Sequence, residues 1–107
     1  SSVAQAAALA SLDVEDELRQ RVDAIVAERD RVVGALAAQG WRLPSTQANF
    51  VWFGLGDASA QLAQACAEAG LVVRTFEGEG VRATIAEPQA NDRLIEVAAS
   101  LAPRLAR

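Results

Sequence analysis

Two arginines, Arg74 and Arg82, are the residues of this chain whose type and spacing best suit chemistry. Arg82 lies in residues 81–85, which alternate between apolar and polar side chains as a half-buried strand does, and Arg74 ends an apolar segment shortly before it. A guanidinium held by a strand presents a planar fork that binds a carboxylate or a phosphate through two hydrogen bonds. If residues 75–80 form a hairpin connection, both arginines reach one end of the sheet, where an anion would offset their repulsion. Pairing with a glutamate of that connection, or exposure to water, is the alternative for each arginine.

The composition offers few side chains for acid–base, covalent or metal-dependent chemistry. The chain has no histidine, and all ten of its basic residues are arginines, so it lacks both an imidazole and a lysine amine for acid–base or covalent work. The single cysteine, Cys66, lies among alanines and is interpreted as a buried apolar side chain rather than a nucleophile. With one cysteine and no histidine, neither an internal disulfide nor a zinc site is expected. The tryptophans and phenylalanines stand mostly within apolar runs and are expected in the core.

Length and charge predict a single soluble domain. A chain of 107 residues that is 51% hydrophobic can bury a core of its own. The formal net charge is −4 and the arginines are scattered, which argues against a face for nucleic acid or for an anionic membrane. No apolar run approaches the roughly 20 residues that cross a bilayer, and no basic segment precedes the alanine-rich start. We therefore expect a cytoplasmic protein that binds neither nucleic acid nor a membrane.

The elements that must position the two arginines follow an α/β order. The apolar, aromatic residues 49–53 lack polar alternation and predict a strand covered on both faces, central in its sheet. Asp13 is a candidate helix cap, and Gly40 is a candidate helix end. The expected elements are helices over residues 3–12 and 13–39, a strand over 49–53, a helix over 59–69, strands over 71–74 and 81–85, and a last helix from Pro88 to near Pro103. This order predicts one α/β domain over residues 1–107, a two-layer sandwich with helices packed on a small sheet.

The N-terminal part of the chain indicates a larger protein. Residues 3–12 are almost all small or apolar, so their helix would need covering on most sides, and residues 1–12 are expected to form an interdomain helix. The following helix carries one apolar stripe at helical spacing, made of Leu18, Val22, Ile25, Val32 and Leu36.

Five stretches of this chain have a familiar order and spacing: SSVAQAAA at residues 1–8, AERDR at 27–31, QANFVW at 47–52, GLVVR at 70–74 and GVRATI at 80–85. Together they resemble the C-terminal small domain of fold-type I pyridoxal-phosphate aminotransferases, in the group of the histidinol-phosphate and aromatic amino acid aminotransferases. The resemblance covers essentially the whole chain. It departs at Ala86, where relatives often carry glycine, and at Thr75, where many carry proline.

The resemblance implies roles that the residues alone do not establish. Arg82 matches the arginine that binds the substrate's acidic group, and Arg74 matches a second arginine near the substrate's anionic end. Pyridoxal phosphate, and the lysine that binds it, would belong to a large domain earlier in the same polypeptide, so this lysine-free chain alone would be inactive. The whole enzyme would be a cytoplasmic homodimer of amino-acid biosynthesis. It would transfer an amino group between histidinol phosphate or an aromatic amino acid and a 2-oxo acid such as 2-oxoglutarate.

Two other functions fit the residues taken alone. A stand-alone amino-acid-binding or regulatory module could hold a carboxylate ligand between Arg74 and Arg82 without chemistry. A structural or oligomerisation domain could dock residues 3–12 on a partner. An upstream large domain in the same reading frame would favour the aminotransferase over both.

Overall fold

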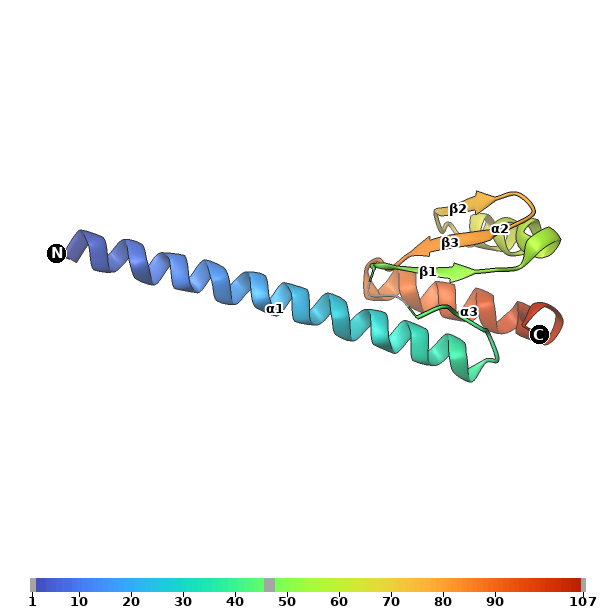
Figure 1. The fold of residues 1–107 in the computed structure, drawn as a ribbon, viewed down its shortest axis with the longest axis horizontal. Helices are drawn as coiled ribbons and strands as arrows, with labels where there is room; N and C mark the ends of the chain where they lie inside the picture. The colour runs from blue at the N-terminus through green and yellow to red at the C-terminus, as the bar shows by residue number, and fades with distance from the viewer. Residues whose placement is uncertain (1, 46–47, 107) are drawn as a thin grey trace.

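A computed structural model describes residues 2–45 and 48–106 of the chain, with side chains from Asp13 onward. Three helices and a three-stranded sheet follow one another along the chain (Figure 1). Their bounds are α1 (Ser2–Ala38), β1 (Phe50–Phe53), the short 3₁₀ turn η1 (Gly56–Ala58), α2 (Ser59–Glu68), β2 (Val73–Phe76), β3 (Gly80–Thr84) and α3 (Pro88–Leu105). None of the helices within the described ranges is long and apolar enough to cross a membrane.

A single helix, α1, occupies the region for which the sequence predicts two. It runs without a break from Ser2 to Ala38, so the predicted helix start at Asp13 was wrong. The residues on both sides of Asp13 are good helix formers and no proline occurs before Pro44, so an exposed aspartate inside the helix does not interrupt the hydrogen-bond ladder. The predicted end is confirmed at Gly40, whose φ of +102° suits glycine and closes the helix. The expected covering of residues 3–12 concerns side chains outside the described set.

The sheet is antiparallel with the strand order β1-β3-β2, so β3 lies in the centre. The prediction that residues 49–53 form the central strand was therefore wrong. Val51 and Phe53 of β1 are buried in the core, whereas Phe50 and Trp52 are half-buried on the opposite face. Side chains of the neighbouring strands cover that second face in place of another layer, which is why an edge strand here carries no polar alternation.

Strand β2 begins two residues later than the sequence indicates. The predicted strand covered residues 71–74, and the observed one is Val73–Phe76. Leu71 instead completes the end of α2, because its N–H donates to the carbonyl of Cys66 at 2.9 Å while Gly70 adopts a φ of +76°. The hairpin that follows is as predicted, with β2 paired to β3.

The core lies between one face of the sheet and the helices. Buried side chains of β1 and β3 pack with those of α1, α2 and α3 in one cluster, among them Val51, Phe53, Val81, Leu36, Leu62 and Leu94. Helix α1 packs on α3, and α2 packs on β2, β3 and α3. This arrangement confirms the predicted α/β fold with helices on a small sheet.

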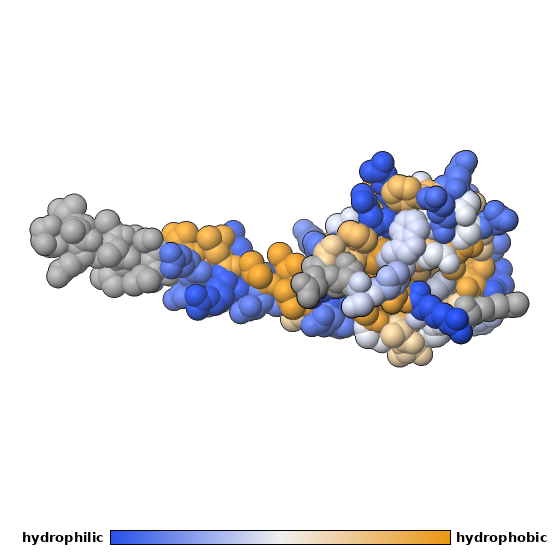
Figure 2. Space-filling model, viewed as in Figure 1, coloured by the Kyte–Doolittle hydropathy of each residue, from blue (hydrophilic) through white to orange (hydrophobic). Residues whose placement is uncertain are grey.

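The first part of α1 projects away from this compact unit (Figure 1). The molecule measures 66 × 23 × 22 Å along its principal axes, and the projecting helix accounts for the long dimension. Figure 2 shows that apolar side chains gather along one side of the projection and polar ones along the other. The predicted apolar stripe is thus only half buried: Val32 and Leu36 are fully buried, whereas Leu18, Val22 and Ile25 are about half exposed.

Candidate anion-binding site

The two predicted arginines lie side by side on the sheet face that the helices leave open. In the strand register, Arg82 of β3 is the partner of Arg74 on β2 and of Trp52 on β1. Directly opposed residues of antiparallel strands point to the same face, so these three side chains form a row across the sheet. The expectation that a hairpin brings the two arginines together is confirmed. A substrate-binding role for them stays a prediction.

Aromatic rings hold both guanidinium groups over this face. The guanidinium carbon of Arg82 lies 5.4 Å from the centre of the Phe50 ring, and that of Arg74 lies 5.2 Å from the centre of the Phe76 ring. A cation above an aromatic face is attracted to it without using its N–H donors. The donors of both arginines therefore stay available for an anion.

The alternative that glutamates of the turn neutralise the arginines is not observed. Within the described part of the chain, the ion pairs involve Arg29 and Arg31, and neither Arg74 nor Arg82 takes part in one. Two cations on directly opposed strand positions destabilise a sheet unless something offsets their repulsion. A carboxylate or phosphate that bridges them would do so, and two parallel N–H donors of one guanidinium would fix its orientation.

The two arginines differ in how firmly they are held. Arg82 lies on the central strand and is partly buried, whereas Arg74 lies on an edge strand and is exposed. Less conformational freedom is lost when a partly buried guanidinium binds a ligand, so Arg82 is the better primary ligand group. Arg74 suits a second anionic group or a longer substrate.

Three aromatic side chains near the arginines, Phe50, Trp52 and Phe76, are half-buried, whereas the sequence analysis expected them in the core. Trp41 and Phe53 are in the core as expected, in an edge contact with ring centres 5.1 Å apart. Trp52 instead lies half-buried on the open face, with its ring centre 5.5 Å from that of Phe76. A side chain at Gly80 would collide with the Trp52 ring at 2.5 Å, so glycine is required where the indole crosses β3. The missed signal was the alternate spacing of Phe50 and Trp52, which places both on one face.

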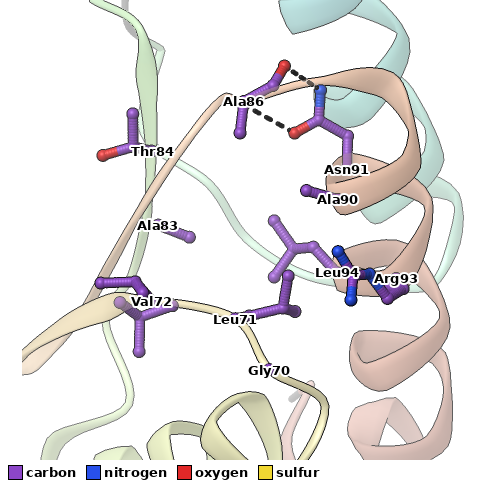
Figure 3. Close-up of a pocket in the computed structure, with 11 residues that line it drawn as sticks. Gly70, Leu71, Val72, Ala83, Thr84, Ala86, Ala90, Asn91, Arg93 and Leu94 are labelled. Carbon is purple, nitrogen blue, oxygen red and sulfur yellow. Dashed lines mark hydrogen bonds between the residues drawn. The ribbon is translucent and has the colours of Figure 1, made fainter.

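Neither arginine lines the two larger surface pockets of the compact unit. One pocket, of about 370 Å³, lies between the hairpin strands and α3. Figure 3 shows its lining, which is mainly aliphatic and includes Leu71, Val72 and Leu94. A second cavity of about 520 Å³ lies between α1 and the residues that follow β3. The arginine row is an open face, so a closed anion site there needs covering from outside this chain. Among the residues that the structure describes, no group of acidic or sulfur side chains could hold a metal ion.

Comparison with known proteins agrees with this architecture. A crystal structure from Burkholderia pseudomallei, of a protein assigned as an aminotransferase, superposes with a TM-score of 0.73 and 28% sequence identity. The match covers 87% of this chain and 30% of that one. The arrangement of helices on one face of a small antiparallel sheet is thus shared with part of that chain.

Sequence comparison establishes the family. The profile of the class I and II aminotransferases matches residues 1–97, and the chain belongs to that family. The aromatic amino acid aminotransferase of Streptomyces avermitilis is 57% identical over 97 residues, which are 91% of this chain and 27% of that protein. The aromatic amino acid aminotransferase of Mycolicibacterium paratuberculosis is 50% identical over all 107 residues, covering 30% of its length. The chain therefore spans about three tenths of the curated relatives that it matches.

Proposed function

We propose that this chain is the small domain of a longer pyridoxal-phosphate-dependent aminotransferase, to which it contributes Arg82 as the group that binds the substrate's carboxylate. The observation that carries the proposal is the placement of Arg82. It stands at the centre of the sheet, over the Phe50 ring, without a carboxylate partner among the described residues, and directly opposite Arg74.

The chemical work of this chain would be binding and orientation. The fork of Arg82 would hold the carboxylate of an amino acid or a 2-oxo acid in one plane and so fix the direction of the neighbouring Cα. Arg74 would bind a second acidic group, such as the side-chain carboxylate of 2-oxoglutarate. Trp52 and Phe76 would exclude water from one side of the bound acid and strengthen both ion pairs.

The cofactor would be supplied from elsewhere in the polypeptide. Pyridoxal phosphate, when bound, provides the electron sink that lets an amino group pass between an amino acid and a 2-oxo acid. The covalent bond that holds it requires a lysine, and this chain has none, so its own residues do not fit that attachment. The chain by itself would accordingly be inactive in transamination.

The projecting part of α1 supports a polypeptide with a further domain. The curated relatives are more than three times as long as the matched region, because it covers 27–30% of them. The exposed stripe of Leu18, Val22 and Ile25 would pack on that further domain, and the same domain would cover the arginine row. A cytoplasmic homodimer is part of this proposal through the family resemblance.

The relatives' names bear on the amino donor. The matched proteins from Streptomyces avermitilis and Mycolicibacterium paratuberculosis are aromatic amino acid aminotransferases. We therefore favour phenylalanine or tyrosine over histidinol phosphate as the donor and 2-oxoglutarate as the acceptor. A screen of the three donors with 2-oxoglutarate decides between them.

Replacing Arg82 by leucine in the full-length enzyme tests the proposal. We expect KM for the carboxylate substrates to rise by roughly 100-fold, because a charge-assisted, bidentate contact is lost, while the absorbance of the bound cofactor is unchanged. Arg42→Leu is the matched control, since Arg42 is exposed and lies outside the arginine row. Unchanged kinetics for Arg82→Leu would remove the assigned role.

Calorimetry on the isolated chain tests the stand-alone binding module. We expect no measurable heat with phenylalanine or 2-oxoglutarate, because the arginine row is open to solvent without a covering domain. Saturable binding that disappears in Arg82→Leu would instead support a binding module. A structural oligomerisation domain predicts neither this binding nor the kinetic effect of Arg82→Leu.

A further inference from the structure

Hydrogen bonds from side-chain amides hold the backbone of residues 85 and 86, which directly follow strand β3 and are called the exit of β3 below. Just beyond the strand, the N–H of Ile85 donates to the carbonyl of Asn49 at 2.9 Å, and the Asn49 amide donates back to the Ile85 carbonyl at 3.1 Å. Asn91, in the first turns of α3, makes the same reciprocal contact with Ala86: it accepts from the Ala86 N–H at 2.8 Å and donates to the Ala86 carbonyl at 2.9 Å. The backbone four residues after Arg82 is thus held from two sides.

Asn91 makes three of the four hydrogen bonds that its side-chain amide can form. Its side chain is 1% exposed, and its second N–H donates to Oε1 of Glu28 on α1 at 3.0 Å. Both donors and the acceptor oxygen of the amide are therefore used. Because a buried amide that loses a partner is strongly destabilised, this arrangement defines one position for the exit of β3.

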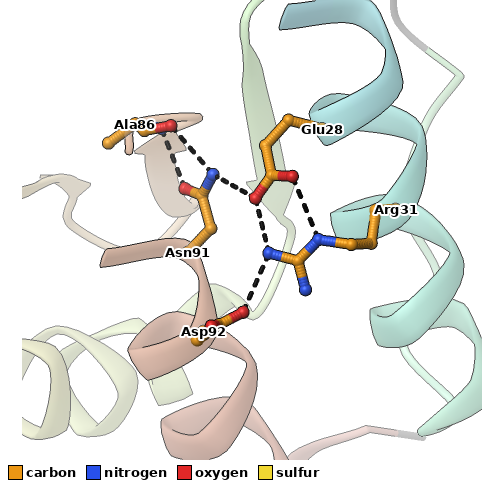
Figure 4. Close-up of polar contacts among 5 residues, drawn as sticks. All are labelled: Glu28, Arg31, Ala86, Asn91 and Asp92. Carbon is orange, nitrogen blue, oxygen red and sulfur yellow. Dashed lines mark hydrogen bonds and ion pairs between the residues drawn. The ribbon is translucent and has the colours of Figure 1, made fainter. Parts of the chain in front are cut away.

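Glu28 is itself held in place (Figure 4). Its two carboxylate oxygens accept from Nε and Nη2 of Arg31 one turn further along α1, and Arg31 also pairs with Asp92 of α3 at 2.8 Å. These contacts, chiefly the one with Arg31, hold the pKa of Glu28 at about 2, below its ordinary value of 4.5. The carboxylate is charged at neutral pH.

Polar contacts join α1 to the exit of β3 beside the shared apolar core. Helix α1 packs on α3, and the cavity of about 520 Å³ separates its residues Ile25 and Glu28 from Ile85 and Pro88 beyond the strand. A continuous polar path runs from Glu28 through Asn91 to Ala86 and links α1 to the end of the strand that bears Arg82.

We propose that Asn91 and Glu28 are positioning residues, which fix Arg82 relative to α1 and hence relative to the rest of the enzyme. The inference rests on the proposed function, because it takes Arg82 as the carboxylate ligand. A bidentate contact depends on placement to within about 1 Å, so a shift of that size weakens binding of the carboxylate. Loosening the exit of β3 lowers substrate affinity without removing any group that touches the substrate.

Kinetics of the full-length enzyme test the inference. We expect Asn91→Ala to raise KM for 2-oxoglutarate about tenfold and Glu28→Gln to raise it about threefold, with kcat changed by less than about twofold in both. Gln89→Ala and Glu96→Gln are the matched controls, because both residues are exposed on α3 and lie outside the cluster. They should leave KM unchanged.

Exchanging the amide and carboxylate groups of residues 91 and 28 distinguishes a positioning role from a general loss of stability. Asn91→Asp places a second carboxylate against Glu28, and adding Glu28→Gln restores a donor–acceptor pair with reversed direction. The double variant should recover part of the KM lost in Asn91→Asp. If Asn91→Ala does not fold, the nearly isosteric Glu28→Gln and the swap still decide the question.

The outcomes are distinct for the two proposals. A normal KM in Glu28→Gln, in Asn91→Ala and in the swap variants, combined with a raised KM in Arg82→Leu, would overturn the positioning role and leave the proposed function intact. A normal KM in Arg82→Leu would overturn both. A fall in kcat with unchanged KM in Asn91→Ala or Glu28→Gln would also overturn the positioning role.

Discussion

The two halves of helix α1 carry the same apolar pattern but lie in different surroundings. In the second half, Val32 and Leu36 are 0% exposed and belong to the core. In the first half, Leu18 and Val22 are 53% and 57% exposed although they continue the same stripe. Under the proposed function the pattern encodes two packing surfaces, and the partner of the exposed one would lie in a further domain. Thus the compact unit has a complete core, while the projecting half of α1 is suited to contact with a further domain.

The largest expected effect is in the buried half. Leu36→Ala should lower the free energy of unfolding of the chain by about 2–5 kcal/mol, because it removes a fully buried side chain and leaves a cavity. Val22→Ala, in the exposed half, should change it by less than about 0.5 kcal/mol. Urea unfolding of both variants measures the difference. Similar losses in the two would mean that the halves are equally packed.

Substitutions in the exposed half of α1 should lower Tm only in the full-length enzyme. Leu18→Glu there should weaken domain packing and lower Tm by a few degrees, since about 1–3 kcal/mol of apolar burial is replaced by a buried charge. In the isolated chain the same substitution should have little effect. Gln20→Glu is the control, because it adds the same charge on the opposite side of the helix. Equal responses to Leu18→Glu and Gln20→Glu in the full-length enzyme would contradict a domain contact.

A smaller effect is expected at the boundary between the two halves, where Glu28 joins α1 to α3. Its pKa falls from 4.5 to about 2 on folding, mainly through the hydrogen bonds from Arg31 and then from Asn91. A lowered carboxyl pKa stabilises the folded state above pH 4.5, and this stabilisation is lost as the pH falls toward 2. The stability difference between the wild type and Glu28→Gln should therefore shrink over this range in urea titrations. A constant difference would rule out the ion pair as its source.

The smallest effect is expected in the labelling of the Cys66 thiol, which is buried in the core of the compact unit. Burial raises the pKa of this thiol. The thiol should react with a thiol-specific reagent in the unfolded chain and only very slowly in the folded one at neutral pH. Rapid labelling without denaturant would show that the compact unit opens readily.

Local patterns predicted the site better than they predicted the topology. The alternation in residues 81–85 and the short connection before it placed Arg74 and Arg82 in one hairpin, because pairing of nearby strands depends on local sequence. Strand order was missed, because half-burial of Phe50 and Trp52 by neighbouring side chains looks in sequence like burial by a second layer. The helix break at Asp13 was wrong because a local capping signal is overridden when good helix formers lie on both sides.

The cluster around Asn91 had no signal in the sequence at all. Glu28 and Asn91 are separated by 63 residues, and their contact exists only because α1 and α3 pack together. The exposed polar positions of a helix look alike in sequence whether or not one of them meets a buried amide. Long-range polar contacts of this kind require the fold.

Amide hydrogen exchange along α1 tests the account most directly. Residues 13–27 should exchange rapidly in the isolated chain, where their side chains are exposed, and slowly in the full-length enzyme. Residues 32–36 should be protected in both. Equal exchange of residues 13–27 in the two forms would contradict the claim that the exposed half of α1 packs on a further domain.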